Sequence, residues 1–190
     1  MLAFTFHTGG KYSVQADQWK ASASSVGLDT LIIERPDLGT WWQNCNQKCE
    51  VVSDVLKQYG NIPILWNDTD IRYVSYPKVF DALEEDLAMF FFNRNVPSGG
   101  VIYLGGESKC RKYVDAWIAN VNLRPEYDDD AWNFGPAVKS IRPRSIYHLT
   151  PSYCWNEKSM RSVYPTTMPV ILHEYIGKRD YPATLDGRAV

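Results

Sequence analysis

Two acidic residues stand one position apart directly after an apolar run. The run is Ile62–Trp66, and the acids are Asp68 and Asp70. In an extended chain, side chains two residues apart point to the same side, so these carboxylates would repel each other unless a cation lies between them. Hard divalent cations such as Mg²⁺ and Mn²⁺ prefer oxygen ligands and also bind phosphates. The pair therefore predicts a metal site that can hold a diphosphate. The alternative is that Asp68 caps a turn and Asp70 is solvated.

Strands and helices alternate in the N-terminal part of the sequence, up to this pair. Apolar runs bounded by Gly or Pro predict strands, and longer amphipathic stretches predict helices. The expected elements are a strand with its glycine turn at 2–10, a helix at 12–27, a strand at 30–34, a helix at 40–60 and a strand at 62–66. This order predicts an α/β fold with a mostly parallel central sheet flanked by helices. Ligands of such sheets bind beyond the carboxyl ends of the strands, which is where Asp68 and Asp70 stand.

The helix expected at 40–60 carries a lysine among its apolar positions. Thr40 is its expected N-cap, and Gly60 is the expected residue just past its C-terminus. Apolar side chains recur every three or four residues, at Trp42, Cys45, Cys49, Val52, Val55, Leu56 and Tyr59. Lys48 either reaches a phosphate or lays its aliphatic stem along the apolar face and keeps its charge in water.

The remainder of the chain predicts fewer and shorter elements. They are a short helix near 81–85, a strand at 87–92, a strand within the segment 99–106, a helix at 107–121, a helix starting at the acidic run 128–130, and a short strand within 169–175. The segment after Lys139 otherwise reads as irregular. Because no repeat, linker or low-complexity tract interrupts the sequence, we expect residues 1–190 to form a single domain.

Composition excludes several classes of protein. The chain has 190 residues, 45% of them hydrophobic, and a formal net charge of −2, which argues against a dominant basic face for nucleic acid. A local basic group remains at Lys139, Arg142, Arg144 and His148. The four cysteines Cys45, Cys49, Cys110 and Cys154 are expected to be reduced or buried thiols, because no second Cys/His pair completes a zinc site. The N-terminus does not resemble a signal peptide and no apolar run could span a membrane, so we expect a cytoplasmic protein.

Several stretches resemble, in the same order along the chain, the motifs of GT-A-fold glycosyltransferases that use nucleotide sugars. They are "PILWNDTDIRYVSYP" with the D-x-D pair and Pro77, "PSGGVIYL" from Pro97, "DDDAWN" from Asp128 and "PVILHEYIGK" from Pro169. "FTFHTGGKY" and "WWQNCNQKCEVVSDVL" resemble the nucleotide-binding first strand and the following helix with its lysine. The resemblance spans nearly the whole chain and is closest to the retaining, glycogenin-like group and related nucleotide-diphospho-sugar transferases.

The resemblance implies a single GT-A (Rossmann-like) domain that moves a sugar from a nucleotide-diphosphate sugar, UDP-linked by this analogy, to an acceptor hydroxyl. It implies Mn²⁺ or Mg²⁺ bound by Asp70 directly, by His173 as a neutral imidazole, and by Asp68 through water or with contact to the ribose instead. Without a metal, these three side chains are expected to destabilise one another, so the metal should stabilise the protein. A purely structural His173 is the alternative.

Further roles follow from the resemblance. Asp128 and Asp129 are the candidates for acting at the sugar, while one of Asp128–Asp130 caps the helix. Donor contacts are expected from Thr8, Tyr12, Lys48, Asp68, Ser98, Gly99, Gly100 and Lys178. Tyr12 would stack on the base, and the Ser98–Gly100 backbone would approach the sugar unless it is a simple turn. Lys178 or Arg179 would lie near the diphosphate, or be solvated.

The acceptor stays open. A saccharide is the default, with Tyr153 and Trp155 as a candidate aromatic platform, and a modified base in phage DNA is an alternative that the basic group would suit. The chain has Ser98 where the family prefers Asn, Asp129 where Gln is usual, and Gly177 one residue late. These departures also allow a non-catalytic module that binds nucleotide sugars.

Overall fold

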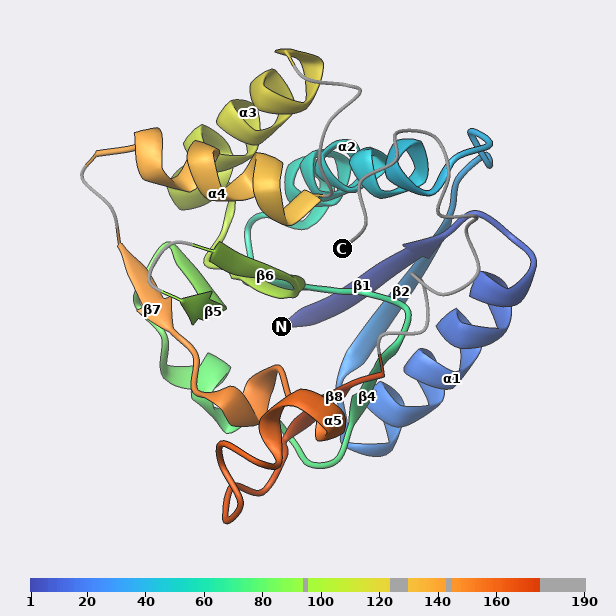
Figure 1. The fold of residues 1–190 in the computed structure, drawn as a ribbon. Helices are drawn as coiled ribbons and strands as arrows, with labels where there is room; N and C mark the ends of the chain where they lie inside the picture. Colours follow the sequence, from blue (N-terminus) through green and yellow to red (C-terminus); the bar gives the residue numbers. More distant parts are fainter. Residues whose placement is uncertain (94–95, 124–129, 143–144, 175–190) are drawn as a thin grey trace.

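A six-stranded sheet forms the centre of the computed structural model, which describes residues 1–93, 96–123, 130–142 and 145–174 (Figure 1). In spatial order its strands are β2 (Asp29–Glu34), β1 (Leu2–His7), β3 (Ile64–Asn67), β6 (Val96–Leu104), β5 (Leu87–Asn93) and β7 (Ile146–His148). β6 runs antiparallel to β3 and β5, and the other pairings in this sheet are parallel. The expected α/β architecture with a mostly parallel sheet is therefore confirmed.

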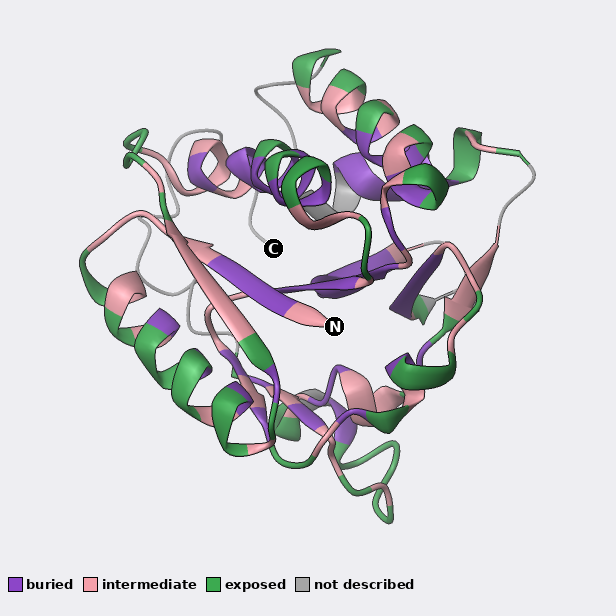
Figure 2. Ribbon diagram, turned by 180° about the vertical axis from the view of Figure 1, so that it is seen from behind, coloured by how far each residue is buried: buried purple, intermediate pink, exposed green. Residues whose placement is uncertain are grey.

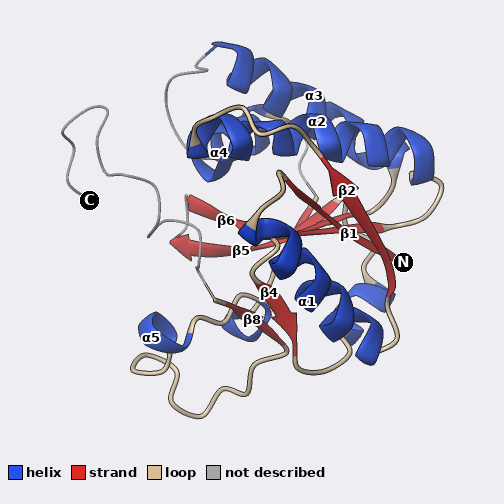
Figure 3. Cartoon of the chain, turned by 90° about the vertical axis from the view of Figure 1, so that its right-hand side faces the viewer, coloured by secondary structure: helices blue, strands red, loops and turns tan. Residues whose placement is uncertain are grey.

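Helices cover both faces of the sheet (Figure 3). On one face lie α2 (Trp41–Tyr59), α3 (Glu107–Leu123) and α4 (Asp130–Ser140), and on the other lie α1 (Lys11–Ser25) and α5 (Glu157–Met160). Short 3-10 helices occupy Lys78–Ala82 and Pro151–Tyr153. The buried residues gather on the central strands and on the helix surfaces that face them (Figure 2).

Strand β3 explains why its sequence is an unbroken apolar run. Ile64 and Trp66 belong to the core beneath α2, α3 and α4, whereas Leu65 belongs to the core on the α1 side. Successive side chains of a strand point to opposite faces, so a strand covered on both faces needs apolar residues at every position. All four residues of β3 are buried, including the polar Asn67 that ends it.

A second, two-stranded sheet lies beside the end of β3. β4 (Ile71–Tyr73) pairs antiparallel with β8 (Ile171–His173), and Ile71 stands opposite His173. The sequence predicts a strand near β8 but none at β4. The pairing joins segments about one hundred residues apart in sequence, so neither one carries a local signal for it.

Several element boundaries differ from the expectation. The short helix expected at 81–85 is a 3-10 helix at Lys78–Ala82 that begins directly after Pro77. β6 begins at Val96, so Ser98–Gly100 lies inside a strand and the interpretation as a simple turn is wrong. β7 and α5 were not expected, since both are very short.

The N-cap of α2 agrees with the expectation, whereas Gly60 stands at the C-cap and not at the C′ position after it. Thr40 is the N-cap, and its hydroxyl accepts a hydrogen bond from the Gln43 amide. Gly60 is the C-cap with φ −72°, and the glycine is needed there for space, because a Cβ would lie 2.6 Å from the Glu107 Cβ. All four cysteines are free thiols, as expected. Among the described residues, no helix combines the length and apolar character that a membrane crossing requires.

Candidate metal centre

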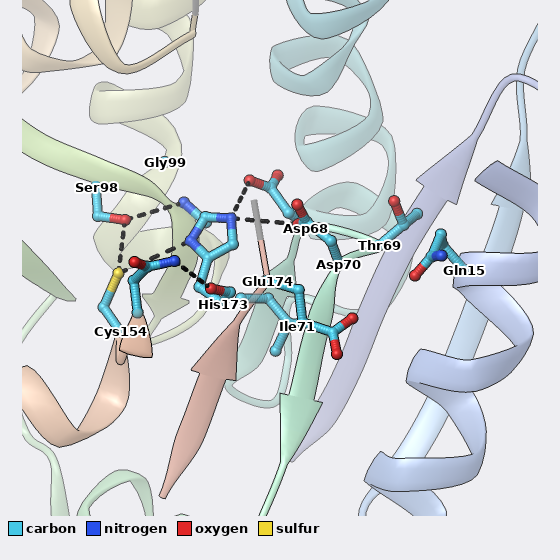
Figure 4. Close-up of polar contacts among 12 residues, drawn as sticks. Gln15, Asp68, Thr69, Asp70, Ile71, Ser98, Gly99, Cys154, His173 and Glu174 are labelled. Carbon is cyan, nitrogen blue, oxygen red and sulfur yellow. Dashed lines mark hydrogen bonds and ion pairs between the residues drawn. The ribbon is translucent and has the colours of Figure 1, made fainter. Parts of the chain in front are cut away.

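Two carboxylates and one imidazole converge beyond the carboxyl end of β3 (Figure 4). The His173 Nε2 lies 3.2 Å from the Asp70 Oδ1 and 3.8 Å from the Asp68 Oδ2. One ligand atom from each residue lies within 4.8 Å of the others. The structure thus brings together the three residues that the sequence analysis named as metal ligands.

Backbone hydrogen bonds from neighbouring strands fix the Asp68–Asp70 segment. The Asp68 amide donates to the Gly100 carbonyl of β6 at 2.9 Å, and the Glu174 amide, just past β8, donates to the Asp70 carbonyl at 3.0 Å. Directly before the segment, the buried Asn67 side chain accepts hydrogen bonds from Trp19 and Tyr73. The two carboxylates therefore stand on backbone that is tied to α1, β4, β6 and β8.

The residues present fit a hard divalent cation. Carboxylate oxygens and an imidazole nitrogen are a common ligand set for Mn²⁺, and the carboxylates also suit Mg²⁺. The ring of His173 reaches the carboxylates because Gly100 has no side chain. A Cβ at Gly100 would lie 2.6 Å from the His173 Cε1 and 2.8 Å from its Nδ1. The missing Cβ at Gly100 therefore makes room for the imidazole of His173. The sequence predicted that it would instead let the backbone approach the sugar.

Each carboxylate also faces a cationic group of the protein. The Lys48 Nζ lies 2.7 Å from the Asp68 Oδ1, and His173 faces Asp70. From the sequence alone, the three side chains are expected to destabilise one another when no metal is bound. Because the acids are paired instead, a metal ion must compete with Lys48 and with a proton on His173.

The proton on His173 is held tightly. Burial would lower the pKa of His173, but the hydrogen bond with Asp70 and the contact with Cys154 outweigh burial and raise this pKa to about 10. A metal ligand needs a neutral imidazole. At neutral pH, binding of a metal at this centre must therefore release the proton of His173.

We expect metal affinity to rise with pH for this reason. The pKa of His173 lies above neutrality, so the proton competes more strongly as the pH falls, and affinity should change roughly tenfold per pH unit. Mn²⁺ titrations at pH 6.5, 7.5 and 8.5 in non-chelating buffers measure this slope. His148→Gln changes an exposed histidine on β7 and should leave the slope unchanged. A Mn²⁺ affinity independent of pH would contradict the assignment of His173.

Lys48 points into the centre and is 4% exposed. Its Nζ also donates to the Gly99 carbonyl at 3.3 Å and lies 5.1 Å from the centre of the Trp66 ring. Of the two interpretations of this lysine, extension of its charge into water is wrong. The ammonium lies next to the carboxylates, where it can meet a phosphate.

The turn after β1 lies at the same edge of the sheet, because β1 and β3 are parallel neighbours. It contains Thr8, which is partly buried, and leads through two glycines with positive φ to Tyr12 at the start of α1. The Gly9 amide donates to the His7 Nδ1 at 3.1 Å and so steadies this turn. The expected donor contacts Thr8 and Tyr12 thus lie in the turn after β1 and at the start of α1, at the edge of the sheet that also carries the metal candidates.

The remaining expected residues fall into two groups: some lie outside the described residues, and others pack elsewhere in the fold. Asp128, Asp129, Lys178 and Arg179 lie outside the described residues. Trp155 is fully buried, so its expected part in an acceptor platform is wrong, and Tyr153 packs edge-on against Phe80. Trp155 belongs to the core on the α1 side, and its packing there explains the large side chain at this position.

Two residues to which the sequence assigned no part in the site contact the centre. Cys154 lies beside the His173 ring, with its Sγ 4.0 Å from the Nδ1. Arg72 holds the D-x-D backbone, because its guanidinium donates to the Thr69 carbonyl at 2.8 Å and the Ile71 carbonyl at 2.7 Å. Arg72 stands two residues after Asp70, and this position is a signal from which its contact could be predicted, whereas nothing in the sequence distinguishes Cys154 from the other cysteines.

Comparisons with known proteins find similarity of structure. No protein-family model matches the chain, and no curated protein matches it in sequence. A glycosyltransferase "involved in the glycosylation of the major capsid of PBCV-1" matches with a TM-score of 0.70 at 11% identity, over 92% of each chain. The glycosyltransferase GlyE of Streptococcus pneumoniae TIGR4 matches in its apo form with a TM-score of 0.65 at 14% identity, and in a second structure with 0.63 at 13%.

These matches establish the fold. The chain is covered over 99% and 100% of its length by the two GlyE structures, but it spans 56% and 57% of theirs. The expected glycosyltransferase-like α/β fold is confirmed by all three structures.

Proposed function

We propose that this protein transfers a sugar from a nucleotide-diphosphate sugar to an acceptor hydroxyl, with Mn²⁺ or Mg²⁺ bound by Asp68, Asp70 and His173. The observation that supports this most strongly is the convergence of these three side chains at the carboxyl end of β3, in a fold shared with glycosyltransferases. Ligands of such sheets bind at this edge.

The side chains of the centre have distinct parts in this proposal. Asp70 and His173 hold the metal, and Asp68 contacts the metal or the ribose. When bound, the metal stabilises the negative charge of the leaving nucleoside diphosphate. Lys48 supplies a second positive charge beside it, held in place by Asp68 and the Gly99 carbonyl.

The remaining donor contacts are proposed from the resemblance. Thr8 and Tyr12 contact the nucleoside, the backbone of Ser98–Gly100 lines the sugar pocket, and Lys178 approaches the diphosphate. Asp128 and Asp129 act at the sugar. We further propose a UDP-linked donor, a saccharide acceptor and retention of the anomeric configuration, because the motifs are closest to those of the glycogenin-like group.

A DNA acceptor has less support. Of the basic group that would suit phosphates, Arg142 directs its guanidinium at carbonyl oxygens of Lys139 and Ile141, at the C-terminal end of α4. This contact explains the presence of Arg142 without a DNA ligand, because cations stabilise the C-termini of helices.

Binding of metal and nucleotide together is the first test. We expect Mn²⁺ with UDP to raise the melting temperature by about 5–10 °C when each is near 100 times its Kd, since such a ligand adds about 2.7 kcal/mol. UDP with EDTA should give a smaller rise. Unchanged melting with Mn²⁺ and millimolar UDP or GDP would argue against the proposal.

Slow hydrolysis of the donor separates a transferase from a binding module. We expect the protein with Mn²⁺ to release free sugar from a UDP-sugar in the absence of an acceptor. A protein that binds the donor but releases no sugar would be a non-catalytic module of the same fold.

A further inference from the structure

Three consecutive residues contact His173, and the first of them, Cys154, lies on the side of the ring away from the carboxylates (Figure 4). The Cys154 Sγ lies 4.0 Å from the Nδ1 of the ring. The Trp155 carbonyl accepts a hydrogen bond from the His173 amide at 2.7 Å, and the Asn156 side chain donates to the His173 carbonyl at 3.0 Å. The segment Cys154–Asn156 therefore holds both the backbone and the ring of this histidine.

The thiol of Cys154 is itself held in place. The Ser98 Oγ lies 3.1 Å from the Cys154 Sγ, and it accepts a hydrogen bond from the Gly100 amide at 3.3 Å. Cys154 and Ser98 are both buried, at 0% and 2% exposure. A buried chain of polar contacts thus runs from β6 through Ser98 and Cys154 to the His173 ring.

The two nitrogens of the His173 ring face different partners, and this determines which of them can bind a metal. The Nε2 faces the carboxylates and the Nδ1 faces Cys154, so a metal at this centre binds the Nε2. A neutral imidazole with a free Nε2 lone pair carries its proton on Nδ1. The Sγ can accept that proton in a hydrogen bond, while the S–H of the thiol donates to Ser98. All of these contacts can therefore form at the same time when His173 carries its proton on Nδ1.

Cys154 is not a fourth metal ligand in this arrangement, because the ring of His173 stands between its sulfur and the carboxylates. Outer partners of this kind fix the tautomer and ring orientation of histidine ligands, and their loss typically lowers metal affinity 10–100-fold. A thiol is an unusual partner, since carboxylates, backbone carbonyls and water are the common ones.

We propose that Cys154, supported by Ser98, is a positioning residue that holds the Nδ1–H tautomer of His173 and aims its Nε2 at the metal. This inference rests on the proposed metal centre. It gives a role to a thiol that the proposed transfer reaction does not itself use.

Mn²⁺ titration followed by electron paramagnetic resonance tests the proposal on three variants. Cys154→Ala removes the acceptor and should weaken Mn²⁺ binding about 10–100-fold. Cys154→Ser keeps an acceptor of similar size and should restore most of the affinity. Cys110→Ala is the matched control, because Cys110 is also fully buried and its Sγ donates to the Asp86 carbonyl at 2.8 Å, away from the centre. It should lose stability as Cys154→Ala does, yet bind Mn²⁺ as the wild type does.

Long-range ¹H–¹⁵N spectra of the imidazoles report the tautomer directly. The protein has three histidines, which keeps the spectrum simple. In the wild type saturated with Mg²⁺, we expect His173 with a protonated Nδ1, and in Cys154→Ala at the same saturation a mixture of tautomers or the loss of this signal.

The outcomes separate the two proposals. Wild-type metal binding together with equal affinity in Cys154→Ala would overturn the positioning role and leave the metal centre intact. Equal loss of affinity in Cys154→Ala and Cys110→Ala would also overturn it, because the loss would then reflect general destabilisation. No binding of Mn²⁺ or Mg²⁺ by the wild type would overturn the metal centre and this inference with it.

Discussion

Asp70→Asn is expected to abolish detectable Mn²⁺ binding at micromolar metal and to lower donor turnover on the order of 10²–10³-fold. The amide keeps the shape of the carboxylate but removes the negative charge that faces His173 at 3.2 Å. A centre with one carboxylate and one imidazole is a poor site for a hard cation. Mn²⁺ titration and hydrolysis of a UDP-sugar measure the two effects.

The same variant should change the pH dependence of the protein. The hydrogen bond with Asp70 counteracts burial and keeps the pKa of His173 high. Without it, only the contact with Cys154 opposes burial, so the pKa of His173 should fall and the residual metal binding should depend less steeply on pH. Asp17→Asn, which changes an exposed carboxylate on α1, is the control and should match the wild type. Normal Mn²⁺ affinity in Asp70→Asn would refute the assignment of Asp70 as a metal ligand.

The fold up to the D-x-D pair could be predicted from the sequence because each element there carries its own pattern. β1, β2 and β3 are apolar runs bounded by turn residues, and α2 has a capping threonine and amphipathic spacing. The pairing of β4 with β8 could not be predicted, since it joins two three-residue strands from distant parts of the chain. The antiparallel direction of β6 depends likewise on tertiary contacts.

The first half of α2 shows where a pattern of apolar residues misleads. The pattern predicted a buried face that includes Trp42 and Cys45, but both are partly exposed. The buried residues there include polar ones, namely Asn44, Asn46, Gln47 and Lys48. Burial of a charged group is costly unless it is paired, so it indicates a site when a partner is present. Only the three-dimensional structure supplies that partner, Asp68.

The ligands of the centre were predictable to different degrees. Asp68 and Asp70 carry a local signal, the position of two acids after a buried strand. His173 was named from the resemblance and lies beside them because β8 pairs with β4. The second contact of its ring had no signal, because Cys154 is an isolated cysteine in an irregular segment.

Lys48→Met is expected to have opposite effects on the metal and on the nucleotide. Methionine has a similar length and can pack on Trp66, but it removes the positive charge 2.7 Å from Asp68. Mn²⁺ should bind more tightly, by about tenfold, because Lys48 no longer competes for the carboxylate. UDP in the presence of saturating Mn²⁺ should bind about 10–100-fold more weakly, because a charge-assisted hydrogen bond to phosphate contributes about 1.5–3 kcal/mol. Calorimetric titrations with Mn²⁺ and then with UDP measure both constants.

The free energy of unfolding of Lys48→Met is a third quantity that can be measured independently of the two affinities. With EDTA, the free energy of unfolding should fall by about 1–3 kcal/mol, less than for a fully buried pair because the Asp68 side chain is 28% exposed. With Mn²⁺ the loss should shrink, because the metal then neutralises Asp68. Lys57→Met changes an exposed lysine on the same helix and should alter none of the three quantities. If Lys48→Met lowered Mn²⁺ and UDP affinity together, Lys48 would be needed for the shape of the centre, and its charge would not be the phosphate contact proposed above.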